Sequence, residues 1–206
     1  MHSPCQASRA RVLLNVCTLA ALLTLAIGSM PALAQELGCG TEVTPEIAQR
    51  FLERWKGQPP QLQMPADDFH ACIPIAAHIV RKSDGTGGLP MSQLEQGIID
   101  CNAMYANTGM VFYLMPTIDY IDDDDYYFNI DTGAEIDDLI QENVVANAVN
   151  VYFTENLAVD NGNFPICGRG SFTTSSPQGV AMANDCTGLA SNPSTFPHEL
   201  GHFFDL

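Results

Sequence analysis

The chain has 206 residues and carries 24 acidic against 8 basic side chains, a formal net charge of −16. This balance argues against a nucleic-acid partner, because binding to phosphates requires lysines and arginines that displace counterions. It disfavours an anionic membrane surface for the same reason. Divalent cations and basic peptides are the charge-compatible partners. Apolar residues make up 46% of the chain, which is typical of one globular domain and excludes a disordered acidic tail.

The first 34 residues have the pattern of a signal peptide. A basic leader with Arg9 and Arg11 precedes an apolar segment, and Pro31-Ala32-Leu33-Ala34 places small residues before a predicted cleavage at Gln35. The alternative is a transmembrane anchor, since the apolar run is nearly long enough to span a bilayer. We therefore expect a secreted, extracellular or periplasmic protein with no stable membrane association after cleavage. The remaining residues carry 24 acids and 6 bases, a net charge of −18.

Five cysteines remain after the predicted cleavage: Cys39, Cys72, Cys101, Cys167 and Cys186. Because the number is odd, at least one is free, is paired outside this chain or has a separate role. In an oxidising compartment the default state of a cysteine pair is a disulfide. Cys167 and Cys186 flank a loop rich in Gly and Ser, and they are predicted either to pair together or to pair with residues outside this chain.

Hydrophobic periodicity predicts the elements in chain order. A helix begins at Thr44-Pro45 and ends at Gly57, and residues 59–68 predict a linker. The predicted elements that follow are a strand at 69–80, a turn at 84–88, a helix at 91–107, a strand at 110–121, a helix at 135–145, a strand at 148–154, a polar loop at 155–178, a strand at 179–183, and a helix from Ser194 that is still running at Leu206. This order predicts a mixed sheet with packed helices, of α+β or α/β class.

Four consecutive acids, residues 122–125, are predicted to form a solvated and self-repelling loop. Calcium binding is the alternative, since Ca²⁺ prefers carboxylate oxygens.

The motif His198-Glu199-Leu200-Gly201-His202 matches H-E-x-x-H on a predicted helix. Residues four apart lie on the same face of a helix, so the two imidazoles can bind one Zn²⁺. Glu199 is then placed to take a proton from a water that zinc activates for attack on a polarised carbonyl. Pro197 is compatible with this helix, because it lies in the first turn where an N–H is not needed. The motif predicts a zinc hydrolase.

The segment from Ser194 to Phe204 resembles the active-site helix of the ulilysin-like pappalysin family of metzincin metallopeptidases. Further segments resemble the family's strands in the same order: residues 78–89, 107–112, 118–121, 150–153 and 179–182. The resemblance extends over residues 70–206. It implies an α+β fold like the N-terminal subdomain of zincins and metzincins, with a mixed, mostly parallel twisted sheet and packed helices that end in the active-site helix.

The resemblance implies a zinc endopeptidase that cleaves protein or peptide substrates, with His198 and His202 as zinc ligands and Glu199 as general base. It also implies Ca²⁺ as a second cofactor. Cys39-Gly40-Thr41 resembles the pro-segment cysteine that keeps these enzymes latent by binding zinc in place of water. A thiolate is a better zinc ligand than water and would close the open coordination position. The alternative for Cys39 is an ordinary disulfide.

The chain departs from the longer family pattern, H-E-x-x-H-x-x-G-x-x-H. Asp205 stands at the Gly position, where Asp is one of the few residues that tolerate a left-handed conformation. The third histidine would fall two residues beyond Leu206. We therefore expect a signal peptide at 1–34, a pro-segment and linker at 35–68, and a truncated N-terminal part of the catalytic domain at 69–206. Such a chain should bind zinc weakly and have little activity by itself.

Two alternatives to this interpretation stay open. One is a thermolysin-like zincin whose third ligand is a downstream Glu, and the other is a non-catalytic, acidic, calcium-binding extracellular module with a vestigial motif. Outside the motif, His78 and His70 are predicted to be structural or exposed. Arg169 is predicted to be solvated, and Met182 to be a core residue.

Overall fold

The computed structural model describes residues 38–41, 44–46, 48–50 and 71–206. The predicted signal peptide at 1–34, the linker at 59–68 and His70 lie outside these residues. Of the helix predicted from Thr44, residues 45–46 and 48–50 are helical, and the rest is not described. All described residues belong to one compact unit, which extends from Leu37 to Leu206.

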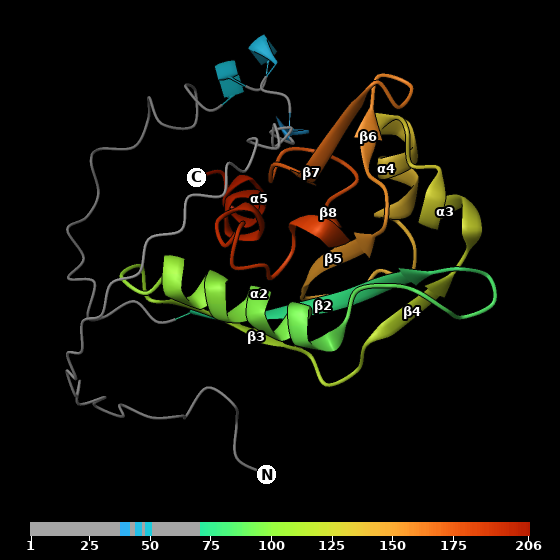
Figure 1. Ribbon diagram of the computed structural model, residues 1–206. Coiled ribbons are helices and arrows are strands. Elements are labelled where there is room, and N and C mark those ends of the chain that lie inside the picture. Colours follow the sequence, from blue (N-terminus) through green and yellow to red (C-terminus); the bar gives the residue numbers. More distant parts are fainter. Residues whose placement is uncertain (1–37, 42–43, 47, 51–70) are drawn as a thin grey trace, which may run out of the picture. The chain divides into compact units, whose positions relative to one another are not determined.

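An eight-stranded sheet forms the centre of this unit, in the order β1-β7-β8-β5-β2-β3, with β4 beside β2 and β6 beside β7 (Figure 1). The strands are β1 (Gly38–Cys39), β2 (Ala71–Arg81), β3 (Met110–Leu114), β4 (Asp119–Asp122), β5 (Val149–Thr154), β6 (Ala158–Val159), β7 (Phe164–Gly170) and β8 (Val180–Ala183). All pairings are parallel except those of β7 with β8 and with β6. The predicted mixed, mostly parallel sheet of an α+β protein is confirmed.

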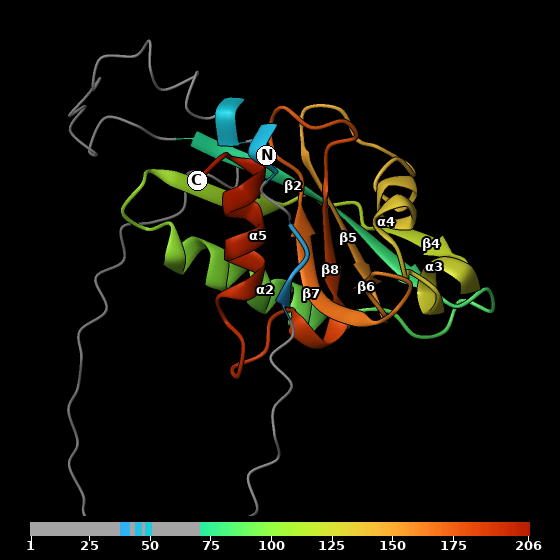
Figure 2. The same cartoon turned by 90° about the horizontal axis from the view of Figure 1, so that it is seen from above.

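Helices cover both faces of the sheet (Figure 2). They are α2 (Met91–Met104), α3 (Asp124–Phe128), α4 (Gly133–Leu139) and α5 (Thr195–Phe203), with a 3₁₀ turn, η2, at Asn184–Cys186. Alternate residues of β2 point to opposite faces, as a strand requires. Ile75 and Ile79 contribute to the core shared with α2 and α5, whereas Val80 contributes to the core shared with α3 and α4. Met182 is fully buried in the first core, as predicted.

The strand predicted at 110–121 is two strands, because Pro116 interrupts it. Pro has no amide hydrogen to donate to a neighbouring strand, so it ends the ladder. β3 pairs with the first half of β2, and β4 pairs with its last four residues, from His78 to Arg81. One long central strand therefore holds both pieces in register.

Three of the four residues in the acidic run are exposed, as predicted, but the run is not a loop: it ends β4 and begins α3. Asp122 ends β4 and forms an ion pair with Arg81, with Oδ1 and Nε 2.7 Å apart. Asp123 caps α3, accepting hydrogen bonds from the amides of Asp125 and Tyr126. An N-cap carboxylate satisfies amides that have no partner within the helix. The run is thus used locally, and within the part of the chain that the structure describes it forms no metal-binding group.

Two further predictions on local structure are corrected. The helix predicted at 135–145 is α4, which begins earlier and ends at Leu139. Its start is set by a capping box in which Thr132 and Glu135 satisfy each other's backbone amides. The polar loop predicted at 155–178 contains β6 and β7. The sequence pattern did not predict β7, because this strand contains Pro165, Gly168 and Gly170. Proline and glycine are disfavoured in strands, and here they interrupt the alternation of large apolar residues.

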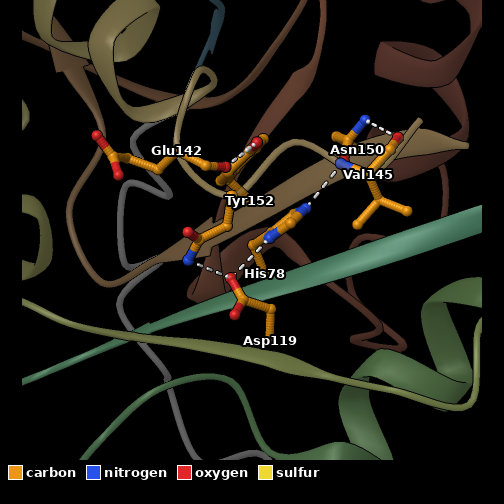
Figure 3. A network of polar contacts seen from close by, with 7 residues as sticks. His78, Asp119, Glu142, Val145, Asn150 and Tyr152 are labelled. Carbon is orange, nitrogen blue, oxygen red and sulfur yellow. Dashed lines mark hydrogen bonds and ion pairs between the residues drawn. The ribbon is translucent and has the colours of Figure 1, made fainter.

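A buried histidine links three elements on one face of the sheet (Figure 3). His78 is fully buried, with its Nδ1 2.9 Å from Asp119 Oδ2 and its Nε2 3.0 Å from Asn150 Oδ1. The Asn150 oxygen also accepts from the amide of Val145, and its nitrogen donates to the Val145 carbonyl, which fixes the orientation of the side-chain amide. The ring stacks on Tyr152 at 4.3 Å. His78 is therefore structural, in agreement with the sequence prediction.

We predict that Asn150→Ala lowers the free energy of unfolding by about 3 kcal/mol, because it leaves Nε2 of the buried His78 and the amide of the partly buried Val145 without their hydrogen-bond partner. Urea denaturation measures the change. Asn156→Ala is the matched control, since Asn156 is exposed and donates only to the Phe128 carbonyl; it should change stability by less than about 0.5 kcal/mol. Equal stability of the two variants would contradict the prediction.

Candidate metal centre

Helix α5 carries the H-E-x-x-H motif and packs on the sheet through its apolar face. Phe196 and Leu200 are buried in the core, and Tyr105 donates a hydrogen bond to the Pro197 carbonyl at 3.0 Å. Pro197 is the third residue of the helix, within the first turn as predicted. These contacts bury Glu199 completely and leave His198 exposed and His202 half-buried.

The helix ends at Phe203, which corrects the prediction that it is still running at Leu206. Asp205 adopts a left-handed conformation, with φ of 59°, and its amide donates to the His202 carbonyl. The Leu206 amide donates to the Gly201 carbonyl, which completes a Schellman motif. The Asp205 carboxylate accepts hydrogen bonds from the amide and hydroxyl of Thr173. Asp205 thus takes the role predicted for it at the Gly position.

Two glycines of β7 allow α5 to approach the sheet closely. A Cβ atom on Gly168 would lie 2.6 Å from Glu199 Cγ, and one on Gly170 would lie 2.2 Å from the Glu199 carbonyl oxygen. The same atom on Gly170 would lie 3.1 Å from His202 Cβ. Only glycine permits contacts this short between a strand and a helix. The close approach places the backbone of β7 directly against the motif.

Arg169 lies between these two glycines and is not the solvated residue that the sequence predicts. Its Nη1 donates to the Gly133 carbonyl at 2.8 Å, and its Nη2 forms an ion pair with Asp137 at 2.9 Å. Both partners belong to α4, on the face of the sheet opposite to α5, as strand alternation requires. Arg169 therefore ties β7 to α4.

Three potential metal ligands meet at the exposed end of the motif. His198 Nε2 and His202 Nε2 are 3.0 Å apart, and Cys39 Sγ is 3.4 Å from His202 Nε2. The ligand atoms of all three residues lie within 4.8 Å of one another. Cys39 comes from β1, which pairs with β7 in parallel, so the sheet edge brings it to the motif across 163 residues of sequence.

These separations fit a zinc ion. Zn–N bonds of about 2.0–2.1 Å and a Zn–S bond of about 2.3 Å in a tetrahedron separate two nitrogen ligands by about 3.3 Å, and nitrogen from sulfur by about 3.6 Å. The observed 3.0 and 3.4 Å are close to both values. Two imidazoles and a thiol are also a donor set that Zn²⁺ prefers.

Glu199 is held by contacts to one of its carboxylate oxygens. Oε2 accepts a hydrogen bond from the Gly170 amide at 2.9 Å and lies 3.2 Å from the Thr41 hydroxyl. The Cys39 thiol is 3.7 Å from the same oxygen. The other oxygen, Oε1, is buried and has no hydrogen-bond partner among the described residues. Of the two oxygens, Oε2 is therefore the one that contacts the ligand cluster, through the Cys39 thiol.

The local environment shifts the pKa values of two of these groups, Cys39 and His202. Burial raises the pKa of the Cys39 thiol, and the Glu199 carboxylate raises it further, against hydrogen bonds from Thr41 that lower it. Burial lowers the pKa of His202; Glu199 opposes this change and His198 adds to it. A lower pKa favours the neutral imidazole, which is the form that binds metals.

A cavity of about 410 Å³ adjoins the cluster and has Tyr105, Pro197, His198 and Glu199 among its lining residues. Cys167 also lines this cavity and forms a disulfide with Cys186, with the Cα atoms 5.3 Å apart. This settles the pairing that the sequence left open, and it links β7 to η2 beside the site. Among the described residues, Cys39 and Cys101 are the free cysteines.

The likeness to known proteins is a likeness of fold. No protein-family model and no curated protein matches the chain. Among solved structures, a mutant of promirolysin from Tannerella forsythia is similar, with a TM-score of 0.52 and 18% identity over 82% of this chain and 69% of that chain. The two chains share a fold. At this identity the likeness to promirolysin shows the fold alone, so membership of the pappalysin family stays a prediction.

The structure brings together His198, Glu199, His202 and Cys39, the four residues that the sequence singled out for the site. Sequence reasoning missed three neighbours: Thr41, Gly168 and Gly170. The available signal was the spacing Gly-Arg-Gly, because glycine at alternate strand positions marks a face that another backbone approaches closely. Among the described residues, no helix is long and apolar enough to span a membrane.

We predict that Gly170→Ala destabilises the protein by about 2 kcal/mol, because the added methyl group would overlap the Glu199 carbonyl. Thermal unfolding measures the change. Gly133→Ala is the matched control: its Cβ would lie 3.5 Å from Arg169 Nη1, and alanine suits a helix, so its stability should be unchanged or higher. A Gly170→Ala variant as stable as this control would refute the close packing of α5 on β7.

Proposed function

We propose that the protein is a secreted zinc endopeptidase, made with a pro-segment that keeps it latent. His198 and His202 would bind zinc, and Glu199 would be the general base. The observation that carries this proposal is the cluster itself: two imidazoles at ligand separation, beside the buried Glu199 carboxylate whose Oε2 the Gly170 amide orients. The shared fold with promirolysin, a metallopeptidase, supports it.

Zinc and Glu199 would have separate roles in hydrolysis. When bound, zinc would supply Lewis-acid polarisation of the substrate carbonyl and lower the pKa of water. Glu199 would accept the proton on Oε2, which lies 3.7 Å from the Cys39 thiol and is oriented by the Gly170 amide. In the latent chain Glu199 is completely buried, with Cys39 and Thr41 in contact with its Oε2. Protein and peptide substrates are the class that this chemistry serves.

Cys39 would hold the enzyme latent. Its thiol lies 3.4 Å from His202 Nε2, within reach of the same metal ion, where it would take the position of the water. In the active enzyme a further protein ligand would be needed, and we propose that it lies beyond Leu206, as the metzincin pattern implies. Disulfide formation between Cys167 and Cys186 supports an oxidising, extracellular location. Calcium stays a prediction from the family resemblance alone.

We predict that zinc binding to the 206-residue chain depends on Cys39, His198 and His202 together. Competition with a chelator should show that His202→Ala or Cys39→Ala weakens zinc affinity by at least about tenfold. Losing a residue that only hydrogen-bonds to a metal ligand already costs that much affinity. Cys101→Ala is the control, since Cys101 is buried and outside the ligand cluster, and it should retain zinc. A chain that never retains zinc would support the non-catalytic module instead.

We predict that peptide hydrolysis, measured at saturating zinc, is weak in the full chain and rises in Cys39→Ala as the metal position opens. Adding Glu199→Ala to Cys39→Ala should lower the rate by about 10²–10⁴, the usual contribution of a general base. Cys101→Ala is the control, because Cys101 is free but buried away from the site. Unchanged hydrolysis in Cys39→Ala would exclude the latency role.

A further inference from the structure

The segment that reaches the metal centre contacts it through two side chains. β1 pairs with β7 in parallel, with Cys39 opposite Gly168, and the Gly40 amide donates to the Gly168 carbonyl at 2.8 Å. This pairing places Thr41 beside Gly170, one step further along the strand. Because residues two apart in an extended chain project to the same side, Cys39 and Thr41 both face α5.

The Thr41 hydroxyl lies within hydrogen-bond distance of three groups. It accepts from the Gly170 amide at 3.0 Å, and it is 3.1 Å from the Gly170 carbonyl and 3.2 Å from Glu199 Oε2. The Gly170 amide in turn is shared between the hydroxyl and the Glu199 carboxylate. The Thr41 hydroxyl therefore shares the Gly170 amide, which is the backbone group that orients the Glu199 carboxylate.

We propose that Thr41 is a second lock, which blocks the general base Glu199 while Cys39 blocks the metal position. This inference rests on the proposed peptidase function. A hydroxyl that donates to a carboxylate oxygen occupies a lone pair that a substrate proton or a water would need. The Cys39 thiol also donates to Glu199 Oε2, at 3.7 Å, but a cysteine that binds zinc does so as the thiolate and has no proton left to donate, so the Thr41 hydroxyl is the donor that remains.

The lock depends on the hydroxyl group and not on the bulk of the side chain. Thr41→Val keeps the shape and loses the hydrogen bonds, whereas Thr41→Ser keeps the hydroxyl and loses a methyl group. The two variants therefore separate a polar contact with Glu199 from simple filling of the groove. The Thr41 amide also donates to Cys39 Sγ at 3.4 Å, but this is a backbone contact that both variants keep, and the effect of each variant is read in the metal-free chain.

The first experiment measures hydrogen exchange of the Gly40 amide in the metal-free full chain, because this amide bonds β1 to β7. Thr41→Val should raise the exchange rate by about fivefold, the factor that one ordinary hydrogen bond contributes. Thr41→Ser should stay within about twofold of the unchanged chain, since it keeps the bond. Equal rates for Thr41→Val and the unchanged chain would overturn the proposal.

A double-mutant cycle tests whether Glu199 is the partner of the Thr41 hydroxyl. In a Glu199→Ala background, Thr41→Val should raise the Gly40 exchange rate by less than about twofold, because the carboxylate it contacts is already absent. If Glu199→Ala does not fold, which exchange of the buried β5 amides will show, Glu199→Leu gives the same comparison, because leucine fills the space and has no acceptor for the Thr41 hydroxyl. A full fivefold effect in both backgrounds would assign the contact to Gly170 alone and overturn the lock on Glu199.

Hydrolysis at saturating zinc separates this proposal from the function on which it rests. Cys39→Ala/Thr41→Val should be about fivefold faster than Cys39→Ala, and Cys39→Ala/Thr41→Ser should equal Cys39→Ala. If Thr41→Val adds nothing while Cys39→Ala is active, the second lock is wrong and the peptidase stands. If neither variant hydrolyses peptides, the peptidase proposal fails and the lock fails with it, whatever the exchange rates.

Discussion

The close contact of helix α5 with strand β7 is the constraint on which the site depends. Gly168 and Gly170 carry no Cβ atoms, so the helix backbone can approach the strand until Glu199 touches the Gly170 amide. This contact fixes one carboxylate oxygen and buries the other. It also leaves the outer edge of β7 beside the histidines, where β1 adds as a further strand.

The opposite face of the sheet keeps this arrangement in place. Arg169 projects away from α5 and binds α4, and His78 joins β2, β4 and β5 through buried polar contacts (Figure 3). A disulfide between Cys167 and Cys186 adds a covalent link at β7. Rigid support on both faces matters, because a base and metal ligands act only when they are held within a fraction of an ångström.

The sequence predicted elements well where a repeating pattern of large apolar side chains exists. β5 and β8, both fully buried, and α2 follow the prediction within a few residues. It failed at β7, since glycines that admit a helix erase the alternation from which strands are recognised. It failed at the acidic run because capping and ion pairing use carboxylates singly, and a run of charge does not reveal which one caps a helix.

The sequence by itself determined that His198 and His202 share a face with Glu199 between them, because helical spacing is a local property of the backbone. It also determined that Asp205 stands where the helix must turn left-handed. Only the tertiary structure decided that Cys39 and Thr41 meet this helix, that Arg169 turns away from it, and which cysteine pairs with Cys167. These outcomes depend on the order of strands in the sheet, which brings residues 160 positions apart into contact and leaves no trace in local spacing.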